Sequence, residues 1–224
     1  MTPQRYQKLR RVLDARQPDL TVLLDDVHKP HNFSAILRSC DAVGVFEAHA
    51  VCTDPALRPN RLTSSGTGKW VRICTHVDIE SAVAALSTRG FQLIAAHPDD
   101  GARDYRDIDY TRPTALVLGA ELLGLGQAAL ASADARVCVP MVGMVESLNV
   151  SVAAATILFE AQRQRSRARL YAQSRLDKAL YDETLFEWAH PDVADYCRRH
   201  ALTYPRLDED GDIIGPLPGP GHPL

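Results

Sequence analysis

Short apolar runs alternate with amphipathic helical segments along most of this 224-residue chain. Apolar runs that are bounded by turn residues predict buried strands. Strands that alternate with helices predict an α/β fold, in which a mostly parallel sheet carries helices on both faces. The expected strands are residues 21–25, 47–52, 71–75, 91–96, 114–118 and 136–139, and the main expected helices are residues 33–43, 79–89 and 148–169.

The two ends of the chain depart from this alternation. Thr2 and Pro3 have the order expected of a helix N-terminus, and a basic segment follows them. Proline and glycine dominate the last residues, which is typical of a disordered tail. The expected organisation is a basic N-terminal helix in residues 1–18, an α/β domain in 19–168, a helical extension in 169–212 with helices near 174–188 and 191–200, and a disordered tail in 213–224.

The composition excludes several classes of protein. With 46% hydrophobic and 24% charged residues, the chain has the make-up of an ordinary globular domain. No apolar run is long enough to span a membrane, and no secretory signal is visible, so we expect a cytoplasmic protein without membrane contact. The five cysteines are scattered and include no CxxC pair, which fits a reducing compartment and disfavours a disulfide framework or a zinc site.

The net charge of −3 conceals a segregation of charges along the chain. Residues 1–16 hold five basic side chains and one acidic, and residues 160–178 hold six basic and two acidic. Residues 179–224 hold three basic and nine acidic side chains. Two basic clusters are typical of a protein with a polyanionic partner, so a nucleic acid is a serious candidate. Solvated helix faces are the alternative for each cluster alone.

The common cofactor motifs are missing from the sequence. No GxGxxG follows a strand, which disfavours a classical dinucleotide fold. Gly119 and Gly124 have the spacing of a P-loop, but Leu125 stands where that loop needs lysine, so an NTPase is rejected. His28 and His31 have a spacing that could hold a metal, although two histidines in a turn are the preferred interpretation.

Three segments that follow strands combine polar residues with glycines or helix starts. The first, from Asn32 to Arg38, would place Arg38 nearly two turns along a helix that Asn32 caps. The second flanks Glu121 with glycines, and such loops let a ligand approach the backbone closely. The third runs from an irregular apolar loop into a polar helix start at Ser147 and Asn149. Each segment alone also fits a capped helix or an ordinary turn.

Together these segments resemble the motifs of the SPOUT (SpoU–TrmD) superfamily of RNA methyltransferases. The matching stretches are HNFSAILR, LVLGAELLGL and VPMVGMVESLNVSVAAATILFEAQRQR, in that order. The two ends of the chain, including LTYPRLDEDG, resemble the TrmH-type branch of tRNA guanosine-2′-O-methyltransferases. The resemblance implies a C-terminal trefoil knot, a homodimer, the methyl donor S-adenosylmethionine with S-adenosylhomocysteine as product, and a tRNA substrate methylated on the ribose of guanosine 18 in the D-loop.

The same resemblance assigns roles to individual residues. Arg38 matches the catalytic arginine, and Asn32 matches the asparagine that positions it. Glu121 matches the carboxylate of the second motif, and Ser147 and Asn149 match the polar pair of the third. The remaining assignments are cofactor contacts at Leu118, Gly119, Met144 and Leu148, and RNA contacts at Arg5, Lys8, Arg11, Arg163 and Arg165.

The implied reaction is physically reasonable. Attack of a ribose hydroxyl on a sulfonium methyl needs in-line placement and loss of the hydroxyl proton. The sulfonium charge disappears during transfer, so the chemistry requires no metal. Arginine is very basic, so Arg38 is expected to stabilise the developing oxyanion, or to act as a base only beside an RNA phosphate. Two alternatives stay open: 2′-O-methylation of another tRNA position or of rRNA, and a non-catalytic RNA-binding scaffold.

Overall fold

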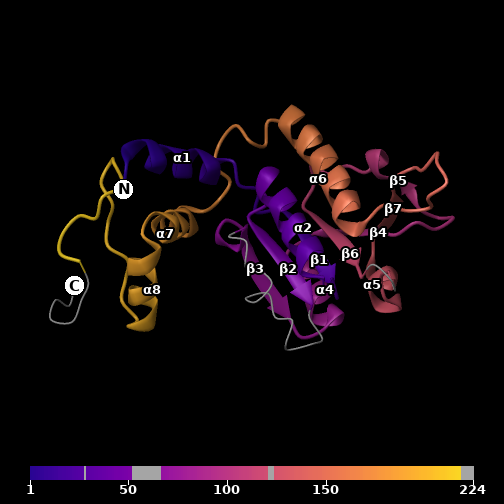
Figure 1. Ribbon diagram of the computed structural model, residues 1–224, viewed down its shortest axis with the longest axis horizontal. Coiled ribbons are helices and arrows are strands. Elements are labelled where there is room, and N and C mark those ends of the chain that lie inside the picture. Colours follow the sequence, from indigo (N-terminus) through magenta and orange to yellow (C-terminus); the bar gives the residue numbers. More distant parts are fainter. Residues whose placement is uncertain (28, 52–66, 121–123, 218–224) are drawn as a thin grey trace. The chain divides into compact units, whose positions relative to one another are not determined.

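The chain folds into two compact units (Figure 1). One unit is Gln17–Tyr171, and the other combines Met1–Arg16 with Ala172–Leu224. The N-terminal helix and the C-terminal extension thus belong to the same compact unit. This computed structural model describes residues 1–27, 29–51, 67–120 and 124–217.

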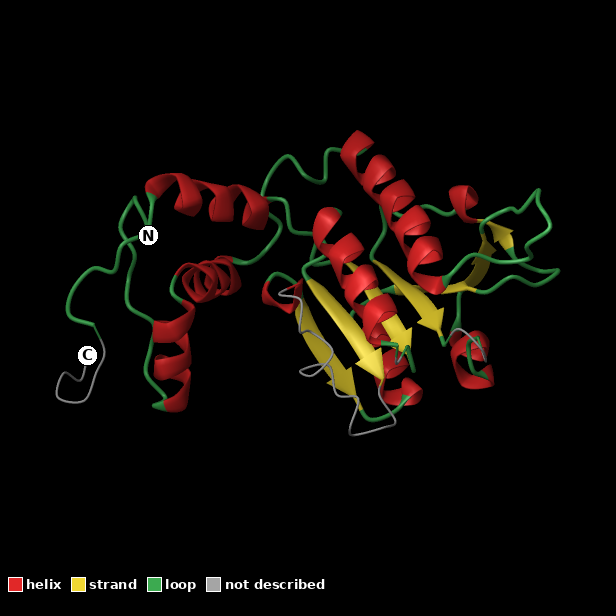
Figure 2. Cartoon of the chain, viewed as in Figure 1, coloured by secondary structure: helices red, strands yellow, loops and turns green. Residues whose placement is uncertain are grey.

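Among the described residues, a seven-stranded sheet is the framework of the larger unit (Figure 2). Its strand order is β3-β2-β1-β6-β4-β7-β5, and all of its strand pairs are parallel. The α/β fold with a parallel sheet is therefore confirmed. The strands are β1 (Leu20–Asp25), β2 (Glu47–Val51), β3 (Arg72–His76), β4 (Gln92–Ala96), β5 (Arg103–Asp104), β6 (Thr114–Gly119) and β7 (Ala135–Cys138).

Helices cover both faces of this sheet. On one face, side chains of α2 and α6 share a buried core with β1 and β6, and on the other face α4 and α5 do so. The central strands β1 and β6 are apolar and buried on both sides, because both of their faces are covered. The helices are α2 (Pro30–Ala42), α4 (Ile79–Thr88), α5 (Gln127–Ser132) and α6 (Val150–Arg167).

Two local expectations differ from the structure. Lys29 is the N-cap of α2 and Pro30 occupies its first turn, so the helix begins before Asn32 instead of being capped by it. Proline is well suited to this position because its missing N–H has no partner there. The short elements α5 and β5 were not expected, because six and two residues are too few for a periodic pattern.

The smaller unit is helical. It contains α1 (Pro3–Asp14), α7 (Lys178–Ala189) and α8 (Pro191–Arg199), with α7 packing against the other two. Thr2 caps α1 as expected. Within the segment expected to be a tail, Ile214 N–H donates to the Arg206 carbonyl at 2.9 Å, and residues 218–224 lie outside the described residues. Within the described ranges, no helix has the length and apolar character needed to cross a membrane.

Candidate active site

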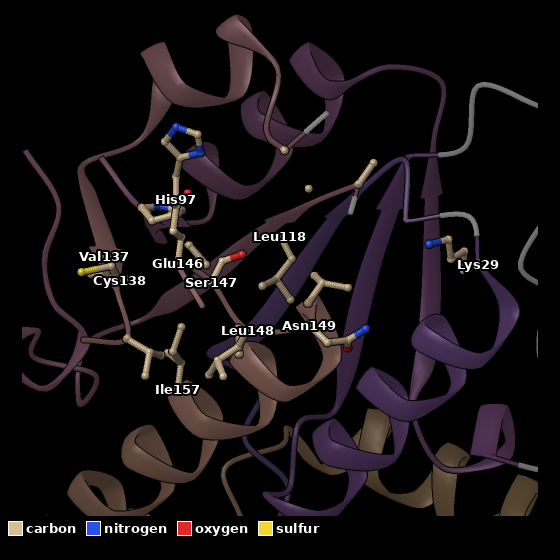
Figure 3. A pocket seen from close by; sticks show the side chains of 18 residues that line it. Lys29, His97, Leu118, Val137, Cys138, Glu146, Ser147, Leu148, Asn149 and Ile157 are labelled. Carbon is tan, nitrogen blue, oxygen red and sulfur yellow. The ribbon is translucent and has the colours of Figure 1, made fainter. Parts of the chain in front are cut away.

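A cavity of about 380 Å³ lies at the carboxyl ends of the central strands. Parallel sheets commonly bind ligands at this edge, where loops leave the strands. Figure 3 shows side chains from three strand ends and from the start of α6 around this space. The lining residues include Ala96, His97 and Pro98 after β4, Leu118, Gly119 and Ala120 at the end of β6, Val137, Cys138 and Val139 at the end of β7, and Glu146, Ser147, Leu148, Asn149 and Ile157.

The loop after β6 folds back on itself at one wall of the cavity. Gly124 N–H donates to the Ala120 carbonyl at 2.9 Å, and Gly124 adopts a φ of +65° that favours glycine. A Cβ atom added to Gly119 would lie 2.2 Å from the Gly124 carbonyl oxygen, so no side chain fits there. Both glycines are therefore needed where the backbone of Gly124 comes back against that of Gly119. This close approach explains why the two glycines have the spacing of a P-loop. Glu121 falls in the 121–123 gap, outside the described residues.

An asparagine pair joins the starts of α2 and α6. Asn149 caps α6, where its Oδ1 accepts hydrogen bonds from Ser151 N–H at 2.9 Å and from Ser151 Oγ at 2.6 Å. Its Nδ2 donates to Oδ1 of the buried Asn32 at 3.3 Å. Residues far apart in sequence, from the first and third motifs, are thus brought together. Ser147 lines the same cavity, two residues before the cap.

Arg38 lies on the exposed side of α2 and does not line the cavity. Six residues of helix rotate its side chain by about 120° from that of Asn32, which explains why one is buried and the other exposed. Since α2 and α6 pack side by side, Arg38 is carried by the same helix pair that holds the asparagines (Figure 1). An exposed guanidinium here is accessible to a large anionic substrate.

Three of the four residues expected to contact the cofactor line the cavity. Leu118, Gly119 and Leu148 line the cavity as expected of cofactor contacts. Met144 does not line it, because its side chain is fully exposed on the loop between β7 and α6. The expected cofactor contact at Met144, through backbone or side chain, stays a prediction.

Several lining residues were not expected from the sequence. Lys29, His97, Cys138 and Glu146 contribute charged or polar groups to the cavity. His97 and Cys138 stand where β4 and β7 end. Because the carboxyl ends of parallel strands share one edge, strand order would have identified these two positions.

A carboxylate also lies on the strand next to the glycine loop. Asp25 ends β1 and pairs in register with Gly119 of β6. Burial raises the pKa of the Asp25 carboxyl above its ordinary value, although a hydrogen bond from the Gly126 backbone partly opposes this. Asp25 is half-buried, so water reaches only part of this carboxyl group.

The basic residues expected to bind RNA fall into three structural situations. Arg5, Lys8 and Arg11 are exposed on α1 of the smaller unit. Arg163 is exposed on α6 and pairs with Glu160, with Nη2 and Oε1 2.6 Å apart. These four side chains are available to phosphates.

Arg165 is fully buried, so the expectation that it contacts RNA is wrong. All five of its N–H groups are used inside the protein. They donate to the carbonyls of Tyr110, Asp19 and Arg112, to Gln17 Oε1, and to the Asp19 carboxylate at 2.7 Å. Arg165 therefore fixes the C-terminal half of α6 to the start of β1 and to the loop before β6.

Family models match most of the chain. Residues 19–159 match the SpoU rRNA Methylase family, and residues 163–216 match the C-terminal model named SpoU, rRNA methylase. The chain belongs to the SpoU methylase family. The resemblance that the three sequence motifs indicated is thereby confirmed.

Relatives within this SpoU family differ in how much of their length they share with the chain. The chain is 48% identical to the tRNA (guanosine(18)-2′-O)-methyltransferase of Escherichia coli, over 95% of this chain and 94% of the relative. It is 54% identical to the enzyme of the same name from Thermus thermophilus, over 84% and 96%. A 23S rRNA (guanosine-2′-O-)-methyltransferase of Ralstonia nicotianae matches at 40%, over 66% of this chain but only 60% of the relative.

Solved structures show the same SpoU fold. The crystal structure of the A. aeolicus TrmH/SpoU tRNA modifying enzyme is 40% identical with a TM-score of 0.78, and the match covers 85% of this chain and 97% of that one. The SpoU methyltransferase AviRb from Streptomyces viridochromogenes, solved in complex with the cofactor AdoMet, is 29% identical with a TM-score of 0.59, over 69% of this chain and 62% of that one.

Proposed function

We propose that this protein transfers a methyl group from S-adenosylmethionine to the ribose 2′-oxygen of guanosine 18 in tRNA. The observation that carries the proposal is the similarity of this chain to enzymes named for that reaction. The similarity extends over 95% and 84% of this chain, and over 94% and 96% of the two relatives. The rRNA relative, by contrast, has about two fifths of its length outside the match.

The cavity fits the expected methyl donor. Its volume of about 380 Å³ is within the range of small-molecule sites, which spans roughly 300–1,000 Å³. Leu118, Leu148 and Ile157 offer apolar walls for a base, and the closely folded backbone at Gly119 offers peptide groups. When bound there, S-adenosylmethionine supplies an electrophilic methyl group, and a related SpoU methyltransferase holds this cofactor.

Residues of the chain are placed to act on the methyl acceptor, the ribose 2′-oxygen. Arg38 stabilises the negative charge that develops on the 2′-oxygen as its proton is lost, since a guanidinium remains charged and donates in a planar fork. Asn32 and Asn149 hold the starts of α2 and α6 in a fixed relation, which orients Arg38 relative to the cavity. Ser147 lines the cavity, and Glu121 is assigned to the same site by its motif alone.

The proposal also covers tRNA binding and the assembly of the protein. Arg5, Lys8, Arg11 and Arg163 are proposed to contact tRNA phosphates, so binding should weaken steeply with salt. We also propose the trefoil knot and the homodimer of the SPOUT superfamily, and a cytoplasmic location with the tRNA.

Exposed apolar side chains support a second copy as partner. Val142, Met144 and Val145 on the loop before α6 are at least 60% exposed, and Val152 and Phe159 on α6 are about half exposed. Large exposed apolar side chains on one loop and on the helix that follows it favour a protein partner. Sedimentation should show a dimer that Phe159→Asp dissociates, and a monomeric wild type would contradict the assembly.

The test is methyl transfer to unmodified bulk tRNA, with ribose methylation mapped by nucleotide. We expect label at guanosine 18, lost in Arg38→Ala and kept in Arg106→Ala, an exposed arginine paired with Asp104. Arg38→Lys should lose most of the rate, because an ammonium lacks the planar fork. Label at another nucleotide would overturn the substrate, and no binding of S-adenosylmethionine would favour the non-catalytic scaffold.

A further inference from the structure

A compact cluster of metal-ligand side chains lies away from the proposed active site. Glu47 and His49 come from β2, and Cys74 and His76 come from β3. The two strands pair in parallel, with His49 opposite Cys74. Because alternate residues of a strand share one face, all four side chains lie on the same face, and none lines the cavity described above.

We propose that Glu47, His49 and Cys74 form a zinc-binding site that joins the outer strand β3 to β2. One ligand atom from each residue lies within 4.8 Å of the others. His49 Nε2 and Glu47 Oε1 are 3.2 Å apart, and Cys74 Sγ and Glu47 Oε2 are 3.5 Å apart. In a tetrahedral zinc site with bonds of about 2.0–2.3 Å, ligand atoms are separated by about 3.3–3.8 Å. The His49–Glu47 and Cys74–Glu47 distances, measured to the two oxygens of one carboxylate, already lie within or close to this range.

The donor set selects the metal. An imidazole nitrogen, a thiolate and a carboxylate are the three ligand types that zinc uses in proteins, and a thiolate disfavours magnesium and calcium. Binding forms one bond from the ion to each residue and releases the Cys74 thiol proton to solvent. Three protein ligands leave a fourth position for water.

His76 supplies the outer contact that a zinc-bound histidine usually has. Its Nε2 lies 2.8 Å from His49 Nδ1, the ring nitrogen that faces away from Glu47. A metal-bound histidine generally donates this second N–H to an acceptor, which fixes its tautomer and ring orientation. His49 is 3% exposed, so its ring is already held in place by the fold.

Arg89 competes with the ion for the Glu47 carboxylate. Its guanidinium bonds to Glu47 Oε1 and stacks on the Phe91 ring at 5.1 Å. The Arg89 side chain is 44% exposed, so it can turn to solvent when the ion takes its place. Removing this competitor should strengthen zinc binding, a result that a purely hydrogen-bonded cluster does not predict.

The test uses the full chain without an affinity tag, stripped of metal and titrated with zinc chloride against a chromophoric chelator. We expect one equivalent to bind, with affinity at least tenfold lower in Cys74→Ser and unchanged in Cys138→Ser, a half-buried cysteine on β7. Arg89→Gln should bind zinc severalfold more tightly, and His76→Ala roughly 10–100-fold more weakly.

Cobalt(II) gives an independent readout of the ligands. The wild type should show a thiolate-to-cobalt charge-transfer band and intense tetrahedral visible bands, both lost in Cys74→Ser. The proposal is overturned if no equivalent of zinc binds, or if Cys74→Ser binds zinc and cobalt as the wild type does. Neither result depends on methyl transfer, so the outcome is separate from that of the proposed function.

Discussion

Replacing Arg165 with methionine tests whether this arginine is structural. Methionine retains an unbranched apolar stem but removes the guanidinium with its five N–H donors, leaving the Asp19 carboxylate and four other acceptors without their partner. Breaking a buried ion pair from one side costs about 3–5 kcal/mol. The Asp19 side chain is 17% exposed, so water reaches part of it and the cost should stay within that range. Natural domains are stable by only about 5–15 kcal/mol, so the loss is a large fraction of the total.

Urea unfolding measures this loss in the larger unit alone. In a Trp188→Phe background, fluorescence reports on Trp70, which belongs to the larger unit. With a slope of about 3 kcal/mol per molar urea, Arg165→Met should lower the midpoint by about 1–2 M. Arg163→Met, two residues away and exposed, should leave the midpoint nearly unchanged but weaken tRNA binding. An Arg165→Met variant that unfolds at the same urea concentration as the wild type and loses only tRNA affinity would refute the structural role of Arg165.

Three further substitutions have defined outcomes. Asn149→Ser keeps an N-cap for α6 but removes the hydrogen-bond donor to Asn32. We expect its free energy of unfolding in urea to stay within about 1 kcal/mol of the wild type, and its kcat to fall at unchanged KM for tRNA. An unchanged kcat would exclude the positioning role. Gly119→Ala places a Cβ against the Gly124 backbone and should weaken S-adenosylmethionine binding more than tenfold, as measured by calorimetry. In the control Gly101→Ala, the added Cβ makes only a van der Waals contact with the Asp99 side chain, so the cofactor should bind as it does to the wild type. Because burial raises the pKa of Asp25, its ionised form weakens folding at neutral pH, so Asp25→Asn should raise the urea midpoint at pH 7. That advantage should disappear as the pH falls below about 4, where both side chains are neutral, and an advantage independent of pH would contradict the assigned cause.

The sheet was predictable because its strands are apolar runs that tertiary packing did not override. β1, β4 and β6 are buried on both faces and were recognised within a residue or two of their observed ends. The start of α2 was missed because Pro30 resembles a turn residue as much as a first-turn helix residue. The strand order was not predictable, since pairing between distant segments leaves no periodic signal in a single sequence.

The site was predictable only in part. Motif residues Asn32 and Asn149 do come together, but their hydrogen bond depends on packing of α2 against α6. Arg165 was misjudged because its neighbours in sequence are basic and exposed, while its own position on α6 faces the core. The cluster at Glu47 and Cys74 was also hidden, because its members become neighbours only when β2 and β3 pair.

The proposed acceptor is a single hydroxyl group, the 2′-oxygen of guanosine 18. The most direct measurement compares two tRNAs that differ at that atom alone, one with guanosine and one with 2′-deoxyguanosine at position 18. With labelled S-adenosylmethionine, we predict one methyl group transferred per tRNA for the first and none for the second. Equal labelling of the two tRNAs would contradict the proposed acceptor.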